Sequence, residues 1–150
     1  MPYQVIYSSA STTPLQQEDL EDILNQARSN NARSGITGAL AYVDGCFLQV
    51  LEGQAEAVQA LMARIATDLR HETLTVLQAG EIAAPAFPDW QMACVSATAA
   101  QVAVWAGLSA RTELPETLEA LRRDREKTMQ VSKSILAMLM GEAAPDEPRG

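Results

Sequence analysis

The chain has 150 residues, 47% of them hydrophobic, which suits a single domain that buries its own core. Nineteen acidic residues against eleven basic ones give a formal net charge of −8, which disfavours nonspecific binding to nucleic acid or to anionic membranes. No apolar run reaches the ~18 residues of a membrane-spanning helix, and the first residues lack the pattern of a secretory signal, so we expect a soluble, cytoplasmic protein.

The N-terminal part predicts a strand, a loop and a helix. Residues 3–8 are rich in aromatic and β-branched side chains, which favour a strand, and a run of small and turn-forming residues follows them. Apolar residues then recur at helical spacing, among them Ile23 and Leu24. We therefore expect a helix over residues 16–31 with one apolar face directed at a core.

Two apolar runs, residues 39–43 and 46–51, are separated by Asp44 and Gly45. An Asp-Gly pair between apolar runs is typical of a hairpin, because both central positions of a type I′ turn need positive φ. The two runs are therefore predicted to be antiparallel neighbours in one sheet.

The second of these runs is apolar on both faces, because Phe47 and Leu51 alternate with Leu48 and Val50. A strand of this kind is covered from both sides. Gln49 shares a face with Phe47 and Leu51, where an unpaired amide would cost about 1–3 kcal/mol, so it needs a hydrogen-bond partner.

The sequence up to residue 96 predicts one more helix, at 55–69, and two more strands, at 73–78 and 91–95. The resulting order, βαββαββ, indicates an α+β fold of the ferredoxin-like type. We expect a mixed five-stranded sheet with both helices on one face.

From residue 97 the sequence takes on helical character, with an alanine-rich segment up to Gly107 and a stretch with regularly spaced apolar residues over 115–140. We expect residues 97–141 to form a helical extension that packs on the other face of the sheet. The acidic, proline-containing residues 142–150 are expected to be disordered.

Three polar side chains are predicted to converge in one apolar layer. Tyr7 lies late in the first strand, Gln49 lies in the third, and Asn31 extends the buried face of the first helix to its end. Spacing alone leaves two explanations open. The three groups bond to one another and to the backbone, as buried polar groups normally do, or they line a ligand site.

The other chemically reactive residues argue against turnover. The single histidine, His71, has no Ser or Cys motif beside it, and the sequence has no phosphate-binding glycine-rich loop or catalytic pair of carboxylates. Cys46 and Cys94 are too few for a disulfide framework or a zinc site, and we expect both to be small buried residues in strands. We therefore predict a binding domain that is not an enzyme and holds no metal.

Four motifs resemble the BLUF family of blue-light photoreceptors. They are NNARSGITG at 30–38, GCFLQVLEG at 45–53, DLRH at 68–71 and FPDWQM at 87–92. They occur in the family's order after a tyrosine in the first strand, and the resemblance runs from about Tyr3 to Val95. By this resemblance residues 1–96 correspond to a BLUF flavin-binding domain.

The resemblance implies that FAD binds noncovalently at the two helices that pack on the sheet, with Tyr7 and Gln49 as the photoactive residues beside the flavin ring. It also implies that Asn31 and Arg70 contact the pyrimidine edge of the flavin, that Ile23 forms an apolar wall, that His71 is a further cofactor contact, and that Trp90 and Met92 form the pair associated with signal output.

The chemistry of these side chains suits the implied roles. An excited flavin is a strong oxidant, and the phenol of Tyr7 can give up an electron and a proton. The amide of Gln49 has a donor end and an acceptor end, so its rotation or tautomerisation changes which flavin atom receives a hydrogen bond. Trp90 and Met92 share a face of the fifth strand, and a change at Gln49 could exchange which of them is inside.

We therefore predict a stand-alone photoreceptor that signals to a downstream partner protein, because only about 55 residues follow the flavin domain, too few for a cyclase or phosphodiesterase domain of ordinary size. A homo-oligomer is also expected. Two alternatives stay open: a flavin-dependent redox enzyme that uses the same pocket, and a regulatory module that binds a small molecule other than flavin.

Overall fold

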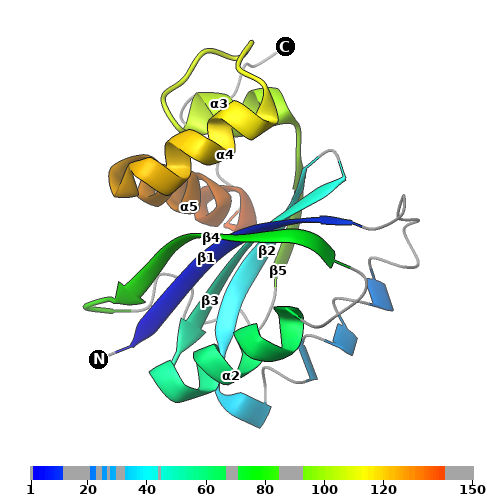
Figure 1. Cartoon of the computed structure of the whole chain (residues 1–150), viewed down its shortest axis with the longest axis vertical. Helices are drawn as coiled ribbons and strands as arrows, with labels where there is room; N and C mark the ends of the chain where they lie inside the picture. The colour runs from blue at the N-terminus through cyan, green and yellow to red at the C-terminus, as the bar shows by residue number, and fades with distance from the viewer. Residues whose placement is uncertain are drawn as a thin grey trace.

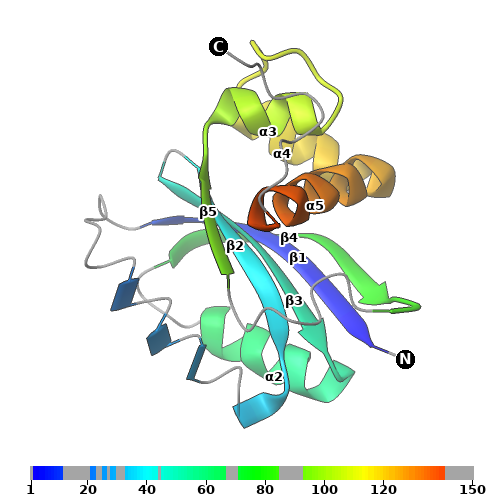
Figure 2. The same ribbon diagram turned by 180° about the vertical axis from the view of Figure 1, so that it is seen from behind.

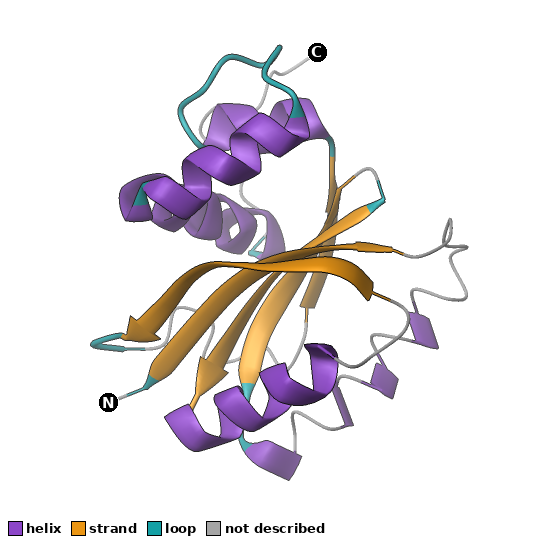
Figure 3. Cartoon of the chain, viewed as in Figure 1, coloured by secondary structure: helices purple, strands orange, loops and turns teal. Residues whose placement is uncertain are grey.

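The structure, a computed structural model, describes residues 2–11, 21–22, 25–26, 28–29, 33–43, 45–66, 71–84 and 93–140. These residues form one five-stranded sheet with helices on both faces (Figures 1 and 3). None of the helices among them is long and apolar enough to cross a membrane.

The sheet consists of β1 (Tyr3–Ser11), β2 (Thr37–Val43), β3 (Cys46–Gly53), β4 (His71–Glu81) and β5 (Ala93–Ala97). Its spatial order is β4-β1-β3-β2-β5. Neighbouring strands are antiparallel except β2 and β5, which run parallel. This mixed sheet confirms the predicted ferredoxin-like α+β class and places β3 at its centre.

One face of the sheet carries α2 (Ala55–Ala66). The helical residues 21–22, 25–26, 28–29 and 33–34 lie on the same side, and the first three pairs fall within the helix predicted over 16–31 (Figure 1). The other face carries α3 (Ala99–Trp105), α4 (Leu114–Arg123) and α5 (Arg125–Leu139), as the view from behind also shows (Figure 2). The predicted placement of the C-terminal helices opposite α2 is therefore confirmed.

Each face of the sheet has its own hydrophobic core. On the α2 side, Phe47 and Leu51 pack with Val58 and Leu61 of the helix. On the other side, alternating residues of the same strand pack with the C-terminal helices, in a cluster that includes Leu48, Val50, Trp105, Leu121 and Ile135. The central strand β3 is buried from both sides, as its apolar pattern predicts.

The hairpin between β2 and β3 forms as predicted. Val43 pairs with Cys46, and Gly45 has φ +85°, the positive value that the turn requires. A second glycine of the strand pair is fixed by close approach, because a Cβ on Gly38 would lie 1.9 Å from the carbonyl oxygen of Val50. No other residue fits at Gly38 without separating β2 from β3.

The C-terminal region differs from the single helical stretch expected over 115–140. Asp124 is extended, with φ −132° and ψ 104°, and divides the stretch into α4 and α5. Its side chain accepts hydrogen bonds from the backbone N–H groups of Glu126 and Lys127, at 3.0 and 3.4 Å, and so caps α5. The charged run around Asp124 is thus a junction between α4 and α5.

Two smaller expectations need correction. β4 extends from His71 to Glu81 and is longer than the predicted strand at 73–78. Cys46 and Cys94 lie in β3 and β5 as expected, but both are half-buried and not fully enclosed.

Candidate functional site

Tyr7 of β1 and Gln49 of the central strand β3 face each other across this antiparallel strand pair. They are direct partners in the β1–β3 register, and the Tyr7 hydroxyl donates a hydrogen bond to Oε1 of Gln49. Tyr7 is fully buried and Gln49 is 7% exposed. Two of the three polar groups that the sequence predicts to converge therefore do so, inside an apolar layer.

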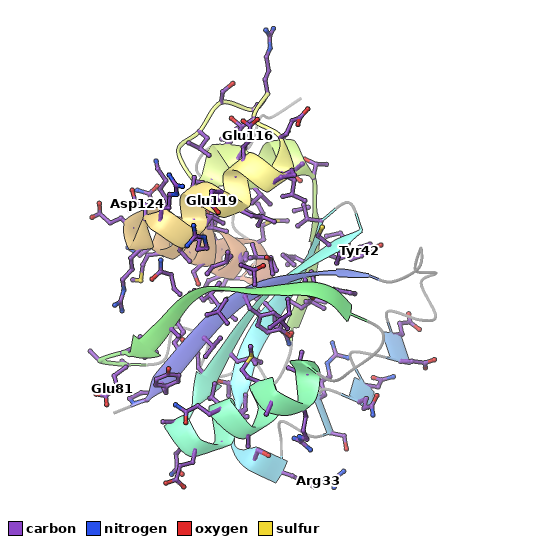
Figure 4. The ribbon with its side chains drawn as sticks, viewed as in Figure 1. Arg33, Tyr42, Glu81, Glu116, Glu119 and Asp124 are labelled. Atoms are coloured by element: carbon purple, nitrogen blue, oxygen red, sulfur yellow. The ribbon has the colours of Figure 1, made fainter. Side chains whose placement is uncertain are left out.

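The residues that surround this pair are apolar and belong to a packed core. Tyr7 belongs to the core cluster on the α2 side, which also contains Val5, Leu40 and Phe47. Phe47 in turn contacts Tyr42, with ring centroids 5.4 Å apart and planes inclined by 45°. Figure 4 shows Tyr42 near the β2–β3 hairpin. A hydrogen bond in such a low-dielectric layer is electrostatically stronger than one in water.

The pair is part of a row that crosses the whole sheet. Tyr7 is the register partner of Val76 on one side and of Gln49 on the other, Gln49 is the partner of Leu40, and Leu40 is the partner of Cys94. Leu40 is buried and Cys94 is half-buried on the same side of the sheet. The row links the buried hydrogen bond to β5 through one apolar side chain.

The pKa of the Cys94 thiol is shifted by burial and by a nearby positive charge. Burial raises the pKa of the Cys94 thiol, and the positive charge of Arg28 lowers it by a smaller amount. The thiol is therefore uncharged at neutral pH. Arg28 belongs to the helical residues on the α2 side of the sheet.

The sequence analysis did not single out Leu40 or assign Cys94 to this row. The pairing of Leu40 with Gln49 could have been predicted from the hairpin register. A two-residue hairpin that pairs Val43 with Cys46 also pairs Leu40 with Gln49, because antiparallel partners have residue numbers with a constant sum. The parallel pairing of β2 with β5 is a long-range contact and has no comparable signal in the sequence.

A second buried polar pair lies on the opposite face of the same two strands. Gln4 donates from Nε2 to Oε2 of Glu52 at 2.9 Å, and the two side chains are 8% and 1% exposed. Gln4 and Glu52 are register partners, three residues along each strand from Tyr7 and Gln49. The β1–β3 contact thus carries one buried side-chain hydrogen bond on each face.

Ile23, Asn31, Arg70, Trp90 and Met92 lie outside the described residues. His71 is described in its backbone only: it is the first residue of β4 and pairs with Ser11.

Within the described ranges, no group of three or more His, Cys, Asp or Glu residues is placed to hold a metal ion. The arrangement that the structure does bring together is a phenol, an amide and an apolar wall. Such a set can exchange donor and acceptor roles across one hydrogen bond.

Comparison with known proteins gives a family match over most of the sheet. The family described as "BLUF: Sensors of blue-light using FAD" matches residues 3–93. Among curated proteins, the photoactivated adenylate cyclase subunit beta-like protein FB of Euglena gracilis is 35% identical over 100 residues. That alignment covers 66% of this chain but 11% of the relative, so the chain spans about a tenth of the length of such relatives.

Solved structures agree over nearly the whole chain. BlsA in its photo-activated state has a TM-score of 0.76 at 28% identity, covering 91% of this chain and 95% of BlsA. The BLUF protein BlrB in its dark state has a TM-score of 0.65 at 31% identity, covering 87% of this chain and 96% of BlrB. The similarity to BlsA and BlrB therefore includes part of the C-terminal helices as well as the sheet.

Proposed function

Because the chain belongs to the BLUF family, the sensors of blue light that use FAD, we propose that it is a photoreceptor switched through the Tyr7–Gln49 hydrogen bond. The single observation that carries this proposal is that bond, buried at the centre of the sheet between the two residue types that the proposed photochemistry needs. The residues around it are apolar, so a bound ring would be shielded from water.

The donor set present fits a flavin. The amide of Gln49 has two N–H donors besides the oxygen that accepts from Tyr7, and the edge of a flavin ring presents carbonyl oxygens and ring nitrogens that accept hydrogen bonds. Asn31 and Arg70 would add polar contacts at the pyrimidine edge, His71 would be a further contact, and Ile23 would add an apolar wall. The bound flavin would supply absorption of blue light and a strongly oxidising excited state, and we propose FAD as the natural form.

The proposed switch reverses the direction of the hydrogen bond between Tyr7 and Gln49. In the present arrangement the Tyr7 hydroxyl donates to Oε1 of Gln49. If the Gln49 amide turns over after light, the group opposite Tyr7 becomes N–H, and if the amide tautomerises in place to the imidic acid, that group becomes O–H. In either case the Tyr7 hydroxyl must accept where it donated. Tyr7 is also the side chain placed to give up and recover a proton at its hydroxyl oxygen during this change.

We propose that the structural change at Tyr7 and Gln49 is transmitted to β5 and then to the C-terminal helices. Leu40 separates Gln49 from Cys94 of β5, and α5 packs against β5 on the other face. Trp90 and Met92, just before β5 in sequence, would exchange positions when Gln49 changes. A bacterial light-regulated adenylyl cyclase shares this fold over 42% of its chain, with a TM-score of 0.62 at 24% identity.

We propose that the recipient is a downstream signalling protein and that the protein acts as a homo-oligomer without turnover of its own. The relatives named as adenylate cyclase subunits support a cyclase-like class of recipient, since their matched region is a tenth of their length.

The test is an absorption spectrum of the purified protein in the dark and after blue light. We expect a flavin spectrum that shifts slightly to the red and recovers in darkness. Tyr7→Phe should abolish the shift and keep the flavin. Tyr3→Phe is the matched control, because Tyr3 lies on the same strand and side of the sheet but has Gly53, not Gln49, as its β3 partner.

Three results would contradict the proposal. A colourless protein that does not take up added FAD would indicate a module for another small molecule. Rapid reduction of the bound flavin by NAD(P)H would indicate a redox enzyme. A normal light response in Tyr7→Phe would show that the hydrogen bond to Gln49 is not the switch.

A further inference from the structure

A pocket of about 280 Å³ lies between α4 and the sheet, on the face opposite to Tyr7 and Gln49. Ser8 of β1 and Leu77 of β4 belong to its sheet side, and Pro115 and Leu118 of α4 form the other wall. Because the β1 and β3 side chains alternate, this pocket and the Tyr7–Gln49 pair are on opposite sides of the same strands.

The fold explains why space remains there. α4 is fixed to β4 at its carboxyl end, where Nε2 of Gln78 donates to the carbonyl oxygens of Leu121 and Arg122 at 3.2 and 3.4 Å. β4 also carries an extra residue at Leu77, where its register with β1 shifts between Ile6 and Tyr7. The helix is therefore anchored at one end beside a bulge, and its earlier turns leave a pocket above the strands.

The sheet side of the pocket contains a hydroxyl group. Ser8 is 5% exposed and belongs to the lining of the pocket. A ligand group that hydrogen-bonds this hydroxyl in place of water would gain affinity and a fixed orientation in the pocket. The apolar walls at Leu77, Pro115 and Leu118 would contact the rest of such a ligand.

The charged residues at the pocket neutralise each other. Nε of Arg122 donates to Oε2 of Glu119 at 3.0 Å, and this hydrogen bond, with a further one from Arg123, lowers the pKa of the Glu119 carboxyl to about 2. Glu119 and Arg122 are therefore both charged at neutral pH and form a pair. Nothing in the lining favours a ligand with a net charge.

We propose that this pocket binds a small uncharged molecule of one or two rings that carries a single hydroxyl or N–H group. A cavity of about 150 Å³ lined by apolar side chains is enough for benzene, so 280 Å³ suits a molecule of up to two rings. The polar group of the ligand would bond the Ser8 hydroxyl, and its rings would lie between Leu77 and Leu118. This site does not depend on flavin chemistry, since it lies on the other face of the sheet.

The experiment is calorimetric titration of the full chain, purified with any flavin it binds and kept in the dark, with 1-naphthol as the probe. We expect saturable binding of one molecule per chain without release of bound flavin. Leu118→Trp, which fills the pocket, should weaken binding at least tenfold, and Ser8→Ala should weaken it several-fold. Glu116→Trp is the control, because Glu116 is exposed on the same helix and does not line the pocket (Figure 4).

Several results would overturn the proposal. They are binding that does not saturate, binding equally strong in Leu118→Trp and wild type, or displacement of flavin by the probe. Tighter binding of 1-naphthoate than of 1-naphthol would show that the site selects an anion, contrary to the paired charges of Glu119 and Arg122. Should Leu118→Trp fail to fold, Ala10→Val narrows the pocket from the β1 side and should give the same loss.

Discussion

At the scale of single residues, the feature that matters most is the pairing of one phenol with one amide across β1 and β3. Tyr7 and Gln49 are held by strand register, and both are enclosed by core residues of the α2 side. Their side chains therefore lose little conformational entropy when they form the hydrogen bond, because packing already restricts their rotamers. The proposed switch would therefore start from one defined hydrogen-bonded arrangement.

The free energy that the Tyr7–Gln49 hydrogen bond contributes to folding can be measured by a double-mutant cycle. Gln49→Leu and Tyr7→Phe each remove the same hydrogen bond, which is worth about 0.5–1.5 kcal/mol net. We expect the two losses to be non-additive by about that amount, and Gln49→Leu to abolish the light response. Denaturant unfolding of the four variants in the dark gives the coupling free energy. Strict additivity would mean that the bond contributes nothing to the folded state.

At the scale of secondary-structure elements, Asp124 is the residue that divides the C-terminal helical region. Its carboxylate accepts from two N–H groups at the start of α5, while Thr128 Oγ1 donates to the carbonyl oxygen of Leu121 at 2.7 Å at the end of α4. The junction thus satisfies polar groups at both helix ends. Figure 4 shows Asp124 at this junction, away from the sheet.

Asp124→Ala should destabilise the protein by about 0.5–2 kcal/mol, because the first turn of α5 loses its side-chain cap. Asp124→Asn should recover most of this loss, since an amide oxygen can accept the same hydrogen bonds. Thermal or denaturant unfolding measures both changes. Equal stability of Asp124→Ala and wild type would show that water replaces the cap without cost.

The sequence predicts the elements that rest on local patterns. The Asp-Gly pair gives the β2–β3 hairpin, and the two-sided apolar pattern of β3 gives a strand covered from both faces. It does not predict the break at Asp124, because neither glycine nor proline occurs nearby and the flanking residues Arg123 and Arg125 are good helix formers. Tertiary packing of α4 and α5 decides that break.

The same distinction applies to the candidate site. Gln49 is identifiable as a buried amide that needs a partner, and Tyr7 as a candidate partner, from strand alternation alone. Cys94 enters the row only through the parallel pairing of β2 with β5, a contact between segments more than fifty residues apart whose register no local pattern specifies. The roles implied for Ile23, Asn31, Arg70, His71, Trp90 and Met92 remain predictions.

At the scale of the whole molecule, one sheet serves two cores. Leu51 packs on the α2 side and Leu48 on the side of the C-terminal helices, and both are almost completely buried. The two halves of the fold therefore share their central strand and should unfold together, as single domains of this size usually do.

Leu48→Ala and Leu51→Ala should each destabilise the protein by about 2–5 kcal/mol, because each leaves a cavity in a packed core. Both variants should still unfold in one transition when followed by circular dichroism and by tryptophan fluorescence. Val76→Ala, at an exposed position of β4, is the control and should cost less than 1 kcal/mol, as surface substitutions do. Two separate transitions would show that the C-terminal helices are an independent unit.

The position of β5 has a consequence for how such a sheet can move. β5 is an edge strand of five residues that, among the described strands, is hydrogen-bonded to β2 alone, whereas β3 is hydrogen-bonded to a strand on each side. A slip of one residue along β2 would reverse every side chain of β5, turning Cys94 toward the C-terminal helices and Val95 toward α2. Such a slip breaks the hydrogen bonds of one short ladder, so β5 is the strand whose register is least costly to change.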